Sequence, residues 1–142
     1  MEPRMRLTVE TTFEAAHFIP GHPKCGGIHG HTYFVTVELV VDRLDEIGMS
    51  VDFGIVKKAI KENFDHKLLI PEDYMELFQR LIYESRTQAK PLVDNLKPVR
   101  YTTVEGLAQE IKLAIDGAVG YEVVSAISIS EGPTQGVTVR WL

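Results

Sequence analysis

Two segments of alternating polarity, separated by a loop rich in Gly and Pro, constrain the fold of this chain most strongly. In each segment the apolar residues recur at every second position, which is the period of a half-buried strand. They are Met5, Leu7, Val9, Thr11 and Phe13 in the first segment, and Tyr33, Val35, Val37, Leu39 and Val41 in the second. Residues 19–28 read as a loop. The sequence therefore predicts a long antiparallel hairpin.

The middle of the chain has the signals of helices. Asp52 can cap a helix whose apolar positions follow helical spacing as far as Phe64, and a second candidate helix covers about residues 72–83. Residues 89–99 contain two prolines and read as a connector. Thr102 and Glu105 form a capping box for a third helix, and Gly117 is a plausible end of that helix.

The C-terminal part returns to strand periodicity. Alternation predicts strands at residues 123–129 and 137–141, with a turn at Gly132 and Pro133 between them. The order is hairpin, helices, hairpin. It predicts a single α+β domain over residues 1–142, with an antiparallel sheet and helices on one face.

Composition excludes several classes of function. A net charge of -5 over 142 residues gives no general attraction to nucleic acid or to anionic membranes. No apolar run reaches the roughly 18 residues of a membrane-spanning helix, and no basic segment followed by an apolar one begins the chain. We therefore expect a cytoplasmic protein. Cys25 is the single cysteine, so the chain has no internal disulfide framework.

Three of the five histidines fall at positions where they can meet. His29 and His31 are two residues apart, so on a strand they point to the same face. A hairpin centred near residue 24 places His17 roughly opposite His31. Three imidazoles with one position left open are typical of a catalytic zinc site. We therefore predict Zn²⁺ at these histidines and leave out His22, for which no such geometric argument exists.

Cys25 lies in the loop of the predicted hairpin, beside Gly26 and Gly27. A nearby metal or positive charge would lower the pKa of its thiol and make it a usable base or nucleophile. Alternatively, Cys25 is a fourth metal ligand that closes a structural site.

Asp65 and His66 follow the first predicted helix. The carboxylate could orient an imidazole that donates or accepts a proton. The alternative is a histidine that only interacts with the dipole at the helix C-terminus.

Several motifs resemble the 6-pyruvoyl-tetrahydropterin synthase family, which includes the 6-carboxy-tetrahydropterin synthases of queuosine biosynthesis. Residues 25–31 read C-x3-H-G-H, after an upstream F-x-A-A-H that ends at His17. The other matching segments are residues 51–54 (VDFG), 64–69 (FDHKLL), 102–108 (TTVEGLA) and 129–132 (ISEG). The resemblance covers nearly the whole chain.

This resemblance implies a tunnelling fold with a four-stranded antiparallel sheet, in which three subunits close a barrel and two rings form a hexamer. It also implies roles for individual residues. His17, His29 and His31 would hold Zn²⁺, and Cys25 would be the general base. Asp65 and His66 would form a proton relay, and Glu131 would bind the pterin edge through two acceptor oxygens.

The activity implied is that of a zinc-dependent lyase. It would convert 7,8-dihydroneopterin triphosphate into 6-carboxy-5,6,7,8-tetrahydropterin, with release of acetaldehyde and triphosphate. The C-x3-H spacing favours this branch over the 6-pyruvoyl-forming branch. A non-catalytic zinc-stabilised interaction domain is the alternative of a different class.

Two departures from the family pattern stand out. Thr102 replaces the usual proline, and the stretch of about residues 70–100 is longer than in compact bacterial members. That insertion could be a lid, an oligomer contact or a decoration.

Overall fold

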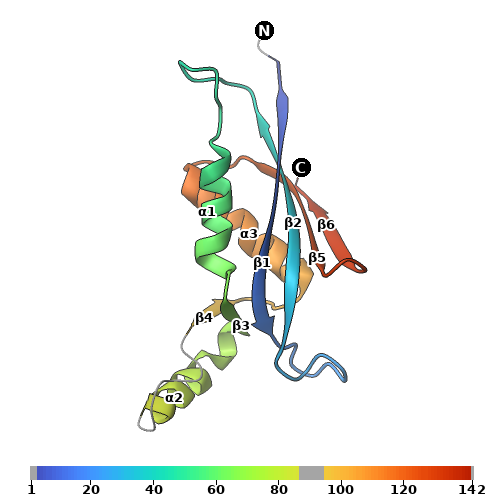
Figure 1. Cartoon of the computed structure of the whole chain (residues 1–142), viewed down its shortest axis with the longest axis vertical. Coiled ribbons are helices and arrows are strands. Elements are labelled where there is room, and N and C mark those ends of the chain that lie inside the picture. Colours follow the sequence, from blue (N-terminus) through green and yellow to red (C-terminus); the bar gives the residue numbers. More distant parts are fainter. Residues whose placement is uncertain (1–2, 87–94, 142) are drawn as a thin grey trace.

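The computed structural model of the chain describes residues 3–86 and 95–141 (Figure 1). Its central element is the predicted hairpin, made of β1 (Met5–His17) and β2 (His29–Val41). The two strands are antiparallel and pair along their whole length, from Met5 opposite Val41 to His17 opposite His29. The long hairpin with its connecting loop is therefore confirmed.

The register of this hairpin differs from the expected one. His17 lies opposite His29, and His31 lies opposite Ala15. The loop is centred on residue 23 rather than 24, which moves each pairing partner by two positions. Because side chains alternate with a period of two, this shift leaves every residue on its predicted face.

The sheet contains more strands than the four-stranded antiparallel sheet that we expected. β5 (Val124–Glu131) and β6 (Gly136–Arg140) extend the hairpin in antiparallel fashion, as predicted. On the other side, β3 (Lys67–Pro71) pairs parallel to β1, and β4 (Leu96–Val99) pairs parallel to β3. Within the described residues the sheet is mixed and six-stranded, in the order β4-β3-β1-β2-β5-β6.

Strands β3 and β4 lack the alternation of apolar and polar residues that predicted the other strands. β3 has successive apolar residues instead of alternation, because both of its faces are covered. β4 contains Pro98, which the connector interpretation had treated as a sign of irregular structure. Proline is tolerated at the edge of a sheet, and β4 is an edge strand.

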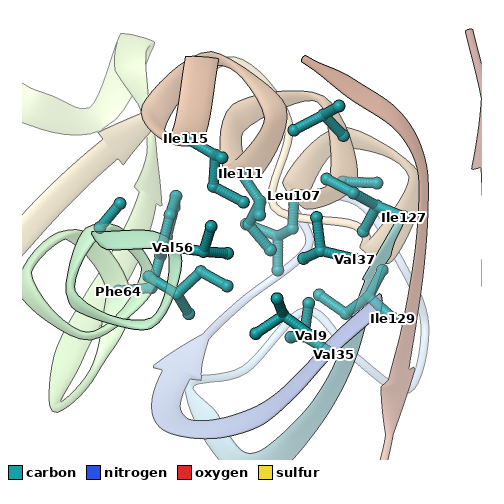
Figure 2. Close-up of a cluster of buried hydrophobic side chains, with 14 of the residues drawn as sticks. Val9, Val35, Val37, Val56, Phe64, Leu107, Ile111, Ile115, Ile127 and Ile129 are labelled. Atoms are coloured by element: carbon teal, nitrogen blue, oxygen red, sulfur yellow. The ribbon is translucent and has the colours of Figure 1, made fainter. Parts of the chain in front are cut away.

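Helices α1 (Phe53–Phe64) and α3 (Val104–Val119) cover one face of the sheet, where Figure 2 shows their apolar side chains meeting those of the strands. Asp52 caps α1 as predicted, and its side chain accepts a hydrogen bond from the amide of Gly54. The helix buries Val56, Ala59, Ile60 and Phe64. The largest fully buried side chains include Phe13, Leu39, Leu107, Ile111, Ile115, Ile127 and Ile129.

Both ends of α3 differ from the prediction. Thr103, not Thr102, is the N-cap, and its hydroxyl accepts a hydrogen bond from the amide of Gly106. The hydroxyl of Thr102 is buried and donates to the carbonyl of Phe18 at 2.6 Å. The helix passes through Gly117 and ends at Gly120, whose φ of 100° suits glycine.

Helix α2 (Met75–Arg86) follows a short 3-10 helix, η1 (Glu72–Tyr74), near the lower end of the molecule (Figure 1). Leu69 belongs to the main core, whereas its neighbour Ile70 packs with Phe18 and Phe78 in a separate cluster. Because successive strand residues point to opposite faces, α2 covers the other face of β3. The expectation of helices on one face holds for α1 and α3 but is wrong for α2.

The expected insertion of about residues 70–100 contains η1, α2 and β4, and its residues 87–94 lie outside the described part of the chain. No helix in the described ranges is long and apolar enough to cross a membrane.

Two glycines of α3 should respond oppositely to alanine. A Cβ on Gly106 would clash with the carbonyl oxygen of Tyr101, whereas a Cβ on Gly117 would meet nothing within 4 Å. We expect Gly106→Ala to lower the free energy of unfolding by about 1–3 kcal/mol through overpacking. Gly117→Ala should raise it by up to about 1 kcal/mol through helix propensity. Urea unfolding at matched protein concentration measures both, and a gain in stability for Gly106→Ala would contradict the close contact.

Candidate active site

Three histidines gather at the loop end of the β1–β2 hairpin. His17 ends β1, His29 begins β2, and His31 follows two residues later on the same face. One ligand atom of each lies within 4.8 Å of the others, so the three can hold a metal ion together. The predicted meeting of these residues is confirmed.

Backbone carbonyls fix the orientation of two of these imidazoles. Nδ1 of His17 lies 2.8 Å from the carbonyl oxygen of Thr102, and Nδ1 of His29 lies 2.7 Å from that of Gly27. Each Nδ1 therefore carries the hydrogen and donates it, which leaves Nε2 as the metal-binding atom. The two Nε2 atoms are 3.1 Å apart. Such outer hydrogen bonds are characteristic of histidines that bind metals.

Burial favours the neutral, metal-binding form of His17. His17 is fully buried, and this burial lowers its pKa, outweighing the opposing effects of Thr102 and Glu131. Nε2 of His31 is buried and has no hydrogen-bond partner among the described residues. Because unpaired buried polar atoms are costly, a metal ion at this point would satisfy an otherwise orphaned nitrogen.

Glu131, at the end of β5, faces the histidine cluster. Its Oε1 lies 3.8 Å from Nε2 of His17, and its Oε2 lies 3.7 Å from Nε2 of His31. The side-chain amide of Gln135 donates a hydrogen bond to Oε2 of Glu131 at 3.3 Å. Glu131 also lines a recess of about 260 Å³, whose other lining residues are Ile19, Thr103, Val104, Glu105, Gln135 and Gly136. The carboxylate thus stands between the histidines and a cavity.

Glu105 shares this recess, and its position is not explained by a capping box. The cap of α3 is formed by Thr103, and Glu105 lies in the first turn of that helix. It is therefore a second carboxylate that a ligand in the recess could meet.

Tyr33 is a site residue that the sequence argument assigned only to a strand. It lies opposite Glu131 and is fully buried, and its hydroxyl has no hydrogen-bond partner in the described ranges. Its ring stacks on Phe13 and meets the rings of His17 and His31 edge-on, with centroids 5.9 and 5.6 Å away. Burial raises its pKa. Its place two residues after His31, on the same face, was the available signal.

Cys25 is half-buried in the loop between β1 and β2. Its carbonyl accepts from the amide of Ile19, and its amide donates to Nδ1 of His22 at 2.8 Å. His22 also accepts from the amide of Lys24 and lies outside the metal-ligand group. His22 thus organises the loop that carries the thiol, and the catalytic role of Cys25 stays a prediction.

Asp65 and His66 contact one another directly after α1. Asp65 accepts from the amide of Glu14 through Oδ1 and lies 2.9 Å from Nδ1 of His66 through Oδ2. The hydrogen bond from Glu14 is the main cause of a lowered pKa at Asp65. His66 has a φ of 58°, the one positive value at a non-glycine residue in the described ranges. This unusual backbone, held by neighbouring contacts, is often found at functional sites.

Within the described residues, no hydrogen bond or ring contact joins this pair to the histidine cluster. His66 instead lines a groove of about 710 Å³ with Glu14 and Thr32, whose side chains hydrogen-bond to one another. Of the three clustered histidines, His31 alone also lines this groove. The structure thus places the predicted relay beside the metal cluster but not in contact with it.

The fold and the cluster together define an α+β protein with three histidines that could hold a metal ion at the end of a long hairpin. The sequence model of the 6-pyruvoyl tetrahydropterin synthase family matches residues 6–141. The chain belongs to this family.

Named relatives agree with this assignment. A Methanocaldococcus jannaschii protein, provisionally named a 6-carboxy-5,6,7,8-tetrahydropterin synthase, is 37% identical, over 90% of this chain and 88% of the relative. The 6-carboxy-5,6,7,8-tetrahydropterin synthase of Rickettsia bellii is 35% identical, over 76% of this chain and 78% of its own.

Solved structures share the fold. A protein of unassigned function from Wolinella succinogenes superposes with a TM-score of 0.72 at 20% identity, covering 97% of this chain and 98% of its own. The 6-pyruvoyl tetrahydropterin synthase of Plasmodium vivax gives a TM-score of 0.64 at 19% identity, with the same coverage. At this identity the likeness establishes the fold alone.

Substitution of His17 and substitution of His22, two histidines of the same hairpin, should have different effects on metal binding. His17→Ala removes a buried ligand, so we expect loss of the metal measured by elemental analysis after dialysis. His22→Ala is the matched control, because the hydrogen bonds of the His22 side chain within the described residues are to the loop amides of Lys24 and Cys25, and this variant should keep one metal per chain. Equal metal content in both variants would show that the cluster is not the metal site.

Proposed function

We propose that this protein is a zinc-dependent 6-carboxy-5,6,7,8-tetrahydropterin synthase, a lyase that acts on 7,8-dihydroneopterin triphosphate, consumes one water molecule, and releases acetaldehyde and triphosphate. The observation that carries the proposal is the gathering of three imidazoles, two of them oriented by backbone carbonyls, next to Glu131, which also lines a recess. Three histidines leave one coordination position for a substrate, as catalytic zinc sites do. The names of the relatives support the same activity.

Zinc, when bound, would polarise oxygen atoms of the substrate side chain. The residues of the chain bind and move protons around it. Glu131 offers two acceptor oxygens to the N–H groups of the pterin edge from the wall of the recess. Cys25 takes a proton from the substrate side chain, and Asp65 orients His66 as the second acid–base group.

An assembly of subunits would complete this site. Strands β4 and β6 are the two edges of the sheet in the described residues, and edge strands present unpaired backbone groups to another chain. We propose a homo-oligomer, a trimer or hexamer, whose sheets join into a barrel. Among the described residues, no hydrogen bond or ring contact joins His66 to the histidine cluster of its own chain, so in such an assembly His66 can serve the site of a neighbour. We place the enzyme in the cytoplasm.

A 6-pyruvoyl-tetrahydropterin synthase would use the same substrate and the same residues, and it is the nearest alternative. The other alternative is a non-catalytic domain in which Cys25 is the fourth zinc ligand and closes the site.

Product analysis tests the proposal directly. Purified protein is incubated with 7,8-dihydroneopterin triphosphate, and the products are identified by mass. We expect 6-carboxy-5,6,7,8-tetrahydropterin, acetaldehyde and triphosphate. The 6-pyruvoyl product would select the alternative enzyme, and unchanged substrate would reject both.

Substitution of Cys25 should impair catalysis without affecting metal binding. Cys25→Ala should keep its zinc and its assembly, while turnover falls by the ~10²–10⁴ typical of losing a positioned acid–base group. Lys24→Ala, next to it in the loop, is the control and should keep most of its turnover. Loss of zinc from Cys25→Ala would make Cys25 a ligand and count against the enzyme.

Glu131→Gln keeps the shape of the side chain but removes its charge. Charge-assisted hydrogen bonds contribute about 1.5–3 kcal/mol, so substrate should bind more weakly by roughly 10- to 100-fold. With zinc in excess, zinc content should stay unchanged. Glu105→Gln tests the other carboxylate of the recess, and wild-type substrate affinity in Glu131→Gln would assign the pterin to another group.

A further inference from the structure

We propose that Glu131 is the fourth ligand of the metal while no substrate occupies the recess, and that this carboxylate is exchanged when substrate arrives. The inference rests on the proposed function only for the presence of a divalent metal at the three histidines. It assigns Glu131 a contact with the metal in addition to its proposed contact with the pterin.

The carboxylate of Glu131 lies close to two of the three candidate metal ligands. Zinc bonds to nitrogen and oxygen are about 2.0–2.2 Å long, which places neighbouring ligand atoms of a tetrahedron about 3.3–3.6 Å apart. The two Nε2 atoms of His17 and His29 are 3.1 Å apart. The carboxylate oxygens of Glu131 lie 3.8 and 3.7 Å from Nε2 of His17 and His31. Each of these two distances involves a different oxygen, and Glu131 lies outside the group of ligand atoms within 4.8 Å of one another. The carboxylate must therefore move toward the three imidazoles to complete the coordination of one ion.

The charge of Glu131 supports the same conclusion. Its side chain is only 13% exposed, and its ion-pair partners among the described residues are the two histidines. A nearly buried carboxylate is costly unless a positive charge compensates it. His17 is fully buried and is held by the carbonyl of Thr102 with Nε2 free to accept a metal. A divalent cation between these groups supplies the missing positive charge.

The turn after β5 holds Glu131 in place. Its amide donates to the carbonyl of Gln135 at 3.0 Å, and the side chain of Gln135 donates back to Oε2 at 3.3 Å. The amide of Gly132 donates to the carbonyl of Thr32 on the neighbouring strand. A hydrogen bond to a ligating carboxylate is the usual arrangement around metal ligands. Gln135 would orient Glu131 in this way.

The recess explains why the fourth ligand must be exchangeable. Glu131 lines this cavity next to the N-terminus of α3, so a molecule that enters it meets the carboxylate before it meets the histidines. A ligand that binds Glu131 can therefore draw it from the metal and free a coordination position. In the empty enzyme the metal would be closed to other small ligands.

Metal titration without substrate tests this inference. Metal-free protein is titrated with Zn²⁺ alone against a chromophoric chelator, and the Co²⁺-loaded protein is examined by visible absorption. Glu131→Gln should weaken zinc binding by roughly 10- to 100-fold and should alter the cobalt spectrum. Glu105→Gln, whose carboxylate shares the recess, should match wild type in both. Circular dichroism of the metal-free proteins verifies that each variant is folded, and Glu131→Asp, with its shorter reach, should give an intermediate affinity.

Unchanged zinc affinity and an unchanged cobalt spectrum in Glu131→Gln would overturn the inference. A loss of affinity in Cys25→Ala with none in Glu131→Gln would also overturn it and would make the thiol the fourth ligand. Failure of the proposed function looks different: wild-type protein would form no pterin product, while the zinc affinity of Glu131→Gln would still fall.

Discussion

The pairing of β1 with β2 is the constraint on which the rest of the structure depends. Thirteen consecutive residue pairs end with His17 opposite His29, at the point where the loop begins. This pairing places three imidazoles on one face at the end of the hairpin. It also sets the edge on which β5 continues, so that Glu131 arrives opposite Tyr33 and beside the histidines. The histidine cluster is thus a consequence of strand register, and a slip of one residue would turn its imidazoles to the other face.

The sequence predicted the parts of the fold that have a clear period or a defined cap. Alternation located the hairpin, β5 and β6, and Asp52 located the start of α1. Strands β3 and β4 were missed because one is covered on both faces and the other contains Pro98. The choice between Thr102 and Thr103 as cap depends on a tertiary contact, since the hydroxyl of Thr102 is taken by the carbonyl of Phe18. No local pattern reports such a contact.

In the site, too, the features with a local sequence pattern could be predicted and those that depend on tertiary contacts could not. The three histidines could be grouped from spacing alone, because a period of two and a hairpin are enough to place them. The position of Glu131 next to them, and the burial of Tyr33 behind them, depend on which strand pairs with β2. The relation of His66 to the cluster depends on α1 and on its left-handed backbone. These are long-range features, so candidate residues could be predicted from the sequence but their contacts could not.

X-ray absorption at the zinc edge of the metal-loaded, substrate-free protein tests the central claim most directly. It reports the number and type of atoms bound to the metal. The account predicts three imidazole nitrogens and one oxygen at about 2.0–2.2 Å, with no sulfur. A sulfur at about 2.3 Å would identify Cys25 as a ligand. Either that result or fewer than three imidazoles would contradict a three-histidine site whose fourth ligand is an exchangeable oxygen.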